Sequence, residues 1–92
     1  MMSESVPISR SLQALFAEID GEAVLLNLQN GKCFAVNQTG CEIWKLLEQP
    51  TTLTNICKGL SMSFDVEPSA IEGEVQAWLA RLEENGLVTQ VE

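Results

Sequence analysis

The chain contains no histidine, no tyrosine and only five basic residues among its 92. Without histidine, general-base, Ser-His and Cys-His catalysis all lose their usual proton carrier. The acidic pairs that could act instead, Glu72 with Glu74 and Glu83 with Glu84, fall where helix faces are normally solvated. The sequence also shows no metal-ligand spacing and no phosphate-binding loop. We therefore expect a protein that binds a partner, not an enzyme.

Basic residues are scattered as well as scarce, because no two of them lie within ten residues of each other. Thirteen acidic residues bring the net charge to -8. A nucleic-acid binder needs a stripe of lysine and arginine that displaces counterions from phosphates. An anionic membrane surface repels an acidic chain for the same reason. We expect neither nucleic acid nor a membrane as a partner.

Cysteine is present, but not in a pattern that indicates chemistry. Cys33, Cys41 and Cys57 form no CxxC motif, and their odd number fits a reducing compartment. We expect them to be small core residues, with neither a metal nor a cofactor. The first residues lack the apolar region of a signal peptide, and no stretch is long enough to span a membrane. These features predict a cytoplasmic protein.

The length predicts one domain, which we place at residues 11–92 after a flexible N-terminal tail at residues 1–10. A hydrophobic fraction of 46% and a charged fraction of 20% are typical of a folded chain. So small a core could gain stability from a partner or from a second copy. The sequence therefore leaves a homodimer open.

Two tight-turn dipeptides, Asp20-Gly21 and Asn30-Gly31, separate three apolar segments at about 12–19, 22–29 and 32–36. Both dipeptides tolerate the positive φ of two-residue hairpin loops, so we expect a three-stranded antiparallel meander. That register would pair Leu15 with Leu26, Leu26 with Ala35 and Leu28 with Cys33. The opposite face would carry Phe16, Leu25, Phe34 and Val36.

Three helices are predicted after the meander. The first begins at a capping box, Thr39-Gly40-Cys41-Glu42, and ends before Pro50. The second is capped by Thr51 or Thr52 and ends near Leu60. The third begins at a second capping box, residues 69–72, and ends at Asn85-Gly86. With a short strand or wing at residues 87–91, the expected fold is α+β, similar to a winged helix-turn-helix.

The third strand, Lys32–Val36, has no expected neighbour on its outer side. An unpaired strand edge is a template for another strand, so an extended peptide could pair with it while apolar pockets read its side chains. The edge could equally be covered by the third helix, the N-terminal tail or a second copy. Trp44 and Trp78 are expected in the core, although a tryptophan at a cleft can also bind.

An ordered set of residues resembles the PqqD-like family, the peptide-recognition elements for ribosomally made and modified peptides. The resemblance covers about Leu15 to Val88. It rests on Leu25-Leu26-Asn27-Leu28, the Asn30-Gly31 turn, Phe34-x-Val36-Asn37, Thr39-Gly40, Ile43-Trp44-x-Leu46-Leu47 and Val75-x-x-Trp78-Leu79-x-x-Leu82-x-x-x-Gly86-Leu87-Val88.

The resemblance implies a winged-helix-like domain that binds a precursor's leader segment as an added strand, in a cleft walled by the third helix. Family members often carry an aspartate where this chain has Glu74, which keeps the charge. The implied peptide-binding residues are Lys32, Cys33, Phe34, Ala35, Val36, Ile71, Glu74, Val75 and Trp78.

The function implied is that of a non-catalytic adaptor in lasso peptide biosynthesis, which presents the precursor to a leader peptidase or another modifying enzyme. One alternative within the family is the peptide chaperone of pyrroloquinoline quinone biosynthesis. Two others lie outside it. They are a winged-helix transcription regulator, which the acidic charge disfavours, and a self-pairing interaction module.

Overall fold

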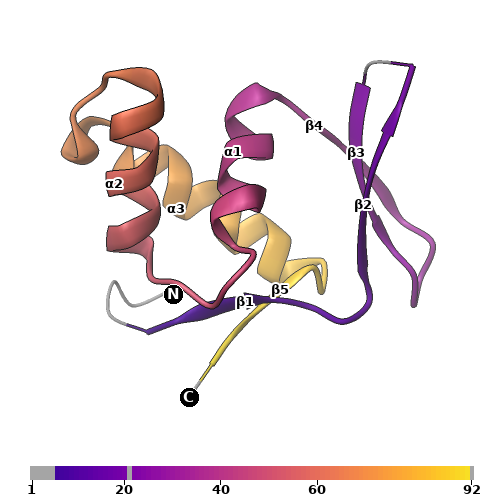
Figure 1. Cartoon of the computed structure of the whole chain (residues 1–92). Helices are drawn as coiled ribbons and strands as arrows, with labels where there is room; N and C mark the ends of the chain where they lie inside the picture. Colours follow the sequence, from indigo (N-terminus) through magenta and orange to yellow (C-terminus); the bar gives the residue numbers. More distant parts are fainter. Residues whose placement is uncertain (1–5, 21, 92) are drawn as a thin grey trace.

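The computed structural model describes residues 6–20 and 22–91, which form an α+β domain of three helices and two small sheets (Figure 1). The expected order of a meander followed by three helices is confirmed. The elements are β1 (Ile8–Arg10), β2 (Ala14–Ile19), β3 (Glu22–Asn27), β4 (Cys33–Val36), α1 (Gln38–Leu46), α2 (Leu53–Phe64), α3 (Pro68–Glu84) and β5 (Val88–Gln90).

The two sheets occupy different sides of the helices. Strands β2, β3 and β4 form the antiparallel meander, which stands beside α1 in Figure 1. Strands β1 and β5 pair antiparallel in a second sheet, which runs beneath the helices in the same view. The expected wing is therefore a strand, and its partner comes from the other end of the chain.

The second sheet corrects the prediction that residues 1–10 form a flexible tail. Residues 1–5 lie outside the described residues, but Ile8–Arg10 is strand β1, and the Ile8 side chain is fully buried. Arg10 stacks 4.6 Å from the centroid of the Trp44 ring and donates a hydrogen bond to the Trp44 carbonyl oxygen. Burial lowers the pKa of Arg10, while the nearby negative charge of Glu48 acts in the opposite direction. The N-terminal segment is thus tied to the end of α1.

The first hairpin has the expected register, with Leu15 opposite Leu26. Asp20 adopts a φ of 52°, as a tight turn requires, while Gly21 lies outside the described residues. The second hairpin differs from the prediction by two residues, because Leu26 lies opposite Cys33. A shift of two residues keeps every side chain on its expected face.

Asn27 explains the different register. Its backbone N–H donates to the Lys32 carbonyl oxygen at 2.9 Å, which leaves a four-residue loop, residues 28–31, between the strands. The Asn27 Oδ1 atom accepts from the Gln29 N–H at 2.8 Å, and its Nδ2 donates to the Asn85 carbonyl oxygen at 2.7 Å. Asn27 is only 3% exposed, so a buried side chain closes the loop and joins it to the end of α3.

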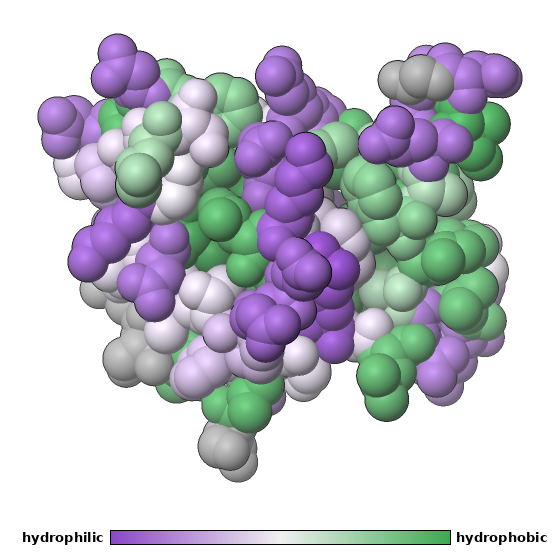
Figure 2. Space-filling view, in the orientation of Figure 1, coloured by the Kyte–Doolittle hydropathy of each residue, from purple (hydrophilic) through white to green (hydrophobic). Residues whose placement is uncertain are grey.

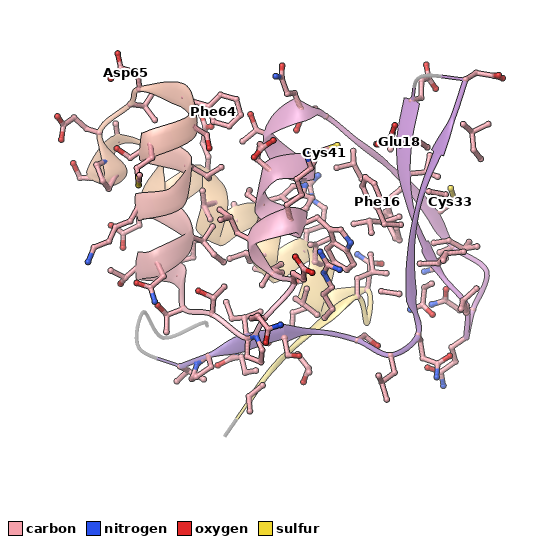
Figure 3. The ribbon with its side chains drawn as sticks, in the orientation of Figure 1. Phe16, Glu18, Cys33, Cys41, Phe64 and Asp65 are labelled. Carbon is pink, nitrogen blue, oxygen red and sulfur yellow. The ribbon has the colours of Figure 1, made fainter. Side chains whose placement is uncertain are left out.

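The meander has a buried inner face and an open outer face. In Figure 3, Phe16 points from β2 toward α1, while Cys33 lies on the side of the sheet away from the helices. The inner face carries the four residues that were predicted to share one face, and the structure shows that this face is the one that packs on or within the core: Phe16, Leu25, Phe34 and Val36. The face assignment therefore survives the change of register.

The helix ends differ from the predicted capping boxes. Asn37, not Thr39, caps α1, because its Oδ1 accepts from the Gly40 N–H at 2.8 Å. Helix α3 begins at Pro68 and has no side-chain cap, since the fixed φ of proline suits the first helical position. Thr52 caps α2 as expected.

Helix α2 extends four residues beyond the predicted end near Leu60. It runs to Phe64 and ends where Asp65 adopts a left-handed φ of 54°. Helix α3 ends as predicted, with Gly86 at a φ of 73° and the Leu87 N–H donating to the Leu82 carbonyl oxygen at 2.8 Å.

Replacing Ile8 with alanine should lower the free energy of unfolding by roughly 2–5 kcal/mol, because the change leaves a cavity beneath the helices. Urea unfolding followed by circular dichroism measures this loss. Leu12→Ala is the matched control, since Leu12 is 97% exposed and its loss should cost less than about 0.5 kcal/mol. Equal stability of the two variants would contradict the placement of β1 in the core.

Candidate functional site

Strand β4 is an edge of the meander. It pairs with β3 on one side, and no other strand within residues 6–20 and 22–91 pairs with its second side. The described part of the N-terminal segment does not cover this edge either, because Ile8–Arg10 pairs with β5. The backbone groups along the free side of β4 are therefore available to another chain.

The register shows which groups point outward. The bond between the Asn27 N–H and the Lys32 carbonyl oxygen makes these two residues a hydrogen-bonded pair. Such pairs alternate along an antiparallel ladder, so Phe34 and Val36 direct their N–H and C=O groups toward β3. Cys33 and Ala35 direct theirs toward the free edge. Both are exposed.

The first of the two hollows that Trp78 lines lies among the three helices, with a volume of about 370 Å³. Figure 3 shows Phe64 at the end of α2, on the side toward α1. The walls are mostly apolar, and one of them is a face of α3. The lining residues are Asn37, Thr39, Gly40, Ile43, Leu60, Phe64, Val66, Ile71, Glu74, Val75 and Trp78. The hollow can accept an apolar side chain.

The second hollow lies between the meander, the start of α1 and the middle of α3, and it is wider, at about 690 Å³. Glu18 from β2 and Cys41 from α1 lie on its two sides in Figure 3. Its lining residues are Glu18, Glu22, Ala23, Ala35, Val36, Asn37, Gln38, Cys41, Trp78 and Arg81. It separates α3 from the free edge of β4.

Trp78 and Asn37 line both hollows, and the Trp78 ring forms the wall between them. The Trp78 ring passes so close to α1 that a Cβ atom on Gly40 would lie 2.9 Å from Cζ2 of the indole and 2.7 Å from Cγ1 of Val36. Glycine at position 40 therefore lets Trp78 pack between α1 and the meander. The two hollows and the β4 edge together form what we call the cleft.

The cleft is more acidic than basic. Glu18, Glu22 and Glu74 line it, against one cation, Arg81. The chain as a whole also carries a net charge of -8. Its field therefore favours a peptide with basic residues near the cleft and speeds the approach of such a peptide at low salt.

The structure brings together six of the nine residues predicted to bind a peptide. The residues that line a hollow are Ala35, Val36, Ile71, Glu74, Val75 and Trp78. The other three are adjacent but line neither hollow. Lys32 directly precedes β4, Cys33 lies on the outer face, and Phe34 packs against the core.

Residues of α1 and of the end of α2 were missed. The sequence pattern predicted that α2 ends near Leu60 and that Phe64 and Val66 are apolar residues of the following loop. Asn37 was named only within the family resemblance, and its role as the cap of α1 was missed because Thr39 offered a recognisable cap. The apolar residues after Leu60 were the available signal.

A comparison with protein families shows which family this chain belongs to. The sequence profile of coenzyme PQQ synthesis protein D (PqqD) matches residues 22–88. The chain belongs to the PqqD family. The matched range includes the meander from β3 onward, all three helices and every residue of the predicted site.

Three solved structures share the fold of this PqqD-family chain. TbiB1 in complex with the TbiA(beta) leader peptide is 28% identical, with a TM-score of 0.78 over 91% of this chain and 98% of that one. Lasso peptide synthetase B1 complexed with the leader peptide is 23% identical, with a TM-score of 0.75 over 95% and 99%.

The third is the PqqD part of Methylobacterium extorquens PqqCD, described as a functional, stand-alone recognition element for ribosomally synthesized and post-translationally modified peptides. It is 20% identical, with a TM-score of 0.80 over 97% of this chain and 95% of that one. A search of curated proteins found no match.

Two other site types were sought in the described part of the chain. No group of three or more histidine, cysteine, aspartate or glutamate residues there is placed to hold a metal ion. No helix among these residues is both long and apolar enough to cross a membrane.

Gly40→Ala should destabilise the fold by about 1–3 kcal/mol, because the new methyl group overlaps Val36 and Trp78 and overpacking outweighs the better helix propensity of alanine. The Trp78 indole N–H resonance should also shift in the NMR spectrum. Gly73→Ala is the control, since nothing lies within 4 Å of its Cβ position, and it should preserve or raise stability. A stable Gly40→Ala protein with an unmoved Trp78 signal would contradict this packing.

Proposed function

We propose that this chain is a non-catalytic adaptor that binds the leader segment of a ribosomally made precursor peptide by strand addition to β4. The observation that carries the proposal is the free edge of β4 beside a cleft walled by α3. TbiB1, the 28% identical structural relative, was solved with a leader peptide, which supports the same class of ligand. The adaptor would present the precursor to a processing or modifying enzyme.

Backbone pairing supplies the first part of the affinity. Cys33 and Ala35 each offer an N–H donor and a C=O acceptor along the free edge, and each bond contributes a net ~0.5–1.5 kcal/mol. Because backbone groups are common to all sequences, these bonds orient the peptide without selecting it.

Side-chain anchors supply the second part. Alternate residues of an added strand point to opposite faces of the sheet, so one set is directed toward α3 and Trp78. The apolar hollow lined by Ile71 and Val75 can take one such side chain. Burying it contributes about 1.5–3 kcal/mol. We infer that selectivity for the leader comes from this contact and from the acidic residues of the cleft.

Presentation needs no reactive group. An adaptor that holds the leader while it contacts an enzyme makes the encounter of precursor and enzyme nearly intramolecular. This proposed role requires neither metal nor cofactor and places the chain in the cytoplasm, where precursor peptides are made. The partner enzyme would be a leader peptidase or another peptide-modifying enzyme.

Two pathways fit this role. We favour lasso peptide biosynthesis, because lasso peptide synthetase B1, which was solved with its leader peptide, shares this fold with a TM-score of 0.75 over 95% of this chain. The second candidate is the precursor-peptide chaperone of pyrroloquinoline quinone biosynthesis, which the match to the PqqD profile supports. The two candidates use the same cleft and differ in the peptide that it binds.

A titration of the ¹⁵N-labelled protein with synthetic leader segments, taken from the short open reading frames beside its gene, tests the proposal. We expect NMR shifts along residues 33–37 and 71–78. Ala35→Pro should weaken binding by about tenfold or more, because it removes an N–H that faces the peptide and leaves the β3 ladder intact.

Ala35→Val is the matched control, because it keeps the N–H in a residue that favours strands, and it should bind like the wild type. Shifts confined to β1 and β5 would contradict the placement of the cleft. Equal affinity of the proline and valine variants would contradict strand addition at this edge.

A further inference from the structure

On the outer face of the meander, every side chain of the three strands is apolar except that of Glu22. We define the outer face by its register as Leu15, Ala17, Ile19, Val24, Leu26, Cys33 and Ala35. Figure 2 shows hydrophobic residues gathered over this sheet, on the right of the view. Leu15 is 46% exposed and Ile19 59%, and the adjacent Leu28 is 55% exposed.

Such a face needs an explanation. An antiparallel sheet with one face on the core normally carries polar residues on the other. Here all three helices lie on the inner side (Figure 1). Contiguous exposed apolar surface is uncommon on a monomer and marks an interaction site.

The charges beside the outer face indicate the kind of partner. The β2–β3 hairpin carries three acidic residues and no basic one: Asp20 and Glu22 lie at the end of the outer face, while Glu18 lies on the opposite face, toward the cleft. No ion pair is formed by these three within the described residues. A second copy would bring the same acidic hairpin and another net charge of -8 to the contact. A partner with basic residues around an apolar centre is complementary, and like charges disfavour the second copy.

The outer face is also continuous with the β4 edge. Cys33 and Ala35 have their side chains on the outer face, while their backbone groups point to the free edge. A strand added to β4 would continue the sheet and place every second side chain on the same face. A protein seated there would touch both the adaptor and its bound peptide.

We propose that the outer face docks the enzyme that acts on the bound precursor, through an apolar patch on that enzyme rimmed by lysine or arginine. This inference rests on the proposed function, since it names the surface that the partner enzyme uses. The enzyme contacts the loaded adaptor over a larger surface than the empty one, so it binds the loaded form more tightly.

The test uses the full chain, its leader peptide, and the peptidase or peptide-modifying enzyme encoded beside its gene. The double variant Leu15→Thr/Ile19→Thr keeps strand-forming residues and removes apolar area. We expect its affinity for the enzyme, measured by biolayer interferometry, to fall about tenfold or more. Its affinity for the leader should stay at the wild-type value, which also shows that it is folded.

Met62→Thr is the matched control, because Met62 is 88% exposed on α2, and it should leave both affinities unchanged. A second variant, Asp20→Asn, removes an acidic group at the end of the face from a residue that lines neither hollow. It should slow association with the enzyme and reduce the salt dependence of that rate. Asparagine tolerates the positive φ at position 20.

Different results overturn different claims. A wild-type chain that binds no leader overturns the proposed function and this inference with it. A wild-type chain that binds the leader but not the enzyme overturns the inference alone. So does a Thr double variant with wild-type affinity for the enzyme. A tight wild-type dimer in sedimentation that the double variant dissociates would show that a second copy occupies the face.

Discussion

The buried side chain of Asn27 is the constraint on which the geometry of this protein depends. Its Nδ2 atom donates to the Asn85 carbonyl oxygen at the end of α3, and its Oδ1 accepts from Gln29 in the loop before β4. A buried amide that lost these partners would cost about 1–3 kcal/mol. The same residue therefore sets the register of β4 and ties the meander to α3. The distance between the meander and α3 sets the width of the cleft.

Close packing at Gly40 and Gly86 also holds the elements around the cleft in place. Gly40 lets the Trp78 ring approach α1 and Val36. At the Schellman-type end of α3, a Cβ atom added to Gly86 would lie 3.0 Å from Nδ2 of Asn27. The cleft is consequently bounded by groups that have little freedom to move. A preformed cleft loses less entropy when a peptide binds. This rigidity favours an adaptor that recognises short segments.

Local patterns predicted much of the fold. The alternation of apolar residues along the strands correctly grouped Phe16 and Leu25 on one face of the meander, and helical periodicity placed Ile71, Val75 and Trp78 on one face of α3. These features depend on neighbours in sequence, so the chain itself reveals them. The open edge of β4 also followed from the order of the turns.

Features that depend on distant partners were not predictable. β1 has one strongly apolar residue, Ile8, and it forms only because β5 arrives from the opposite end of the chain. The Asn30-Gly31 dipeptide indicated a two-residue turn, but the Asn27 side chain stabilises a longer loop because Asn85 holds it from α3. Asn37 replaced Thr39 as the cap since it stands one residue before the helix starts. Tertiary contacts decided the cases of β1 and of the loop, whereas the Asn37 cap is a local bond to the Gly40 N–H.

Amide hydrogen exchange at Cys33 and Ala35 is the first measurement to make, because it reports whether a leader peptide adds as a strand to β4. Both N–H groups face the free edge, so we expect fast exchange in the free protein and strong protection once the leader is bound. Phe34 and Val36, which bond to β3, should be protected in both states. Unchanged exchange at Cys33 and Ala35 in a saturated leader complex would contradict strand addition.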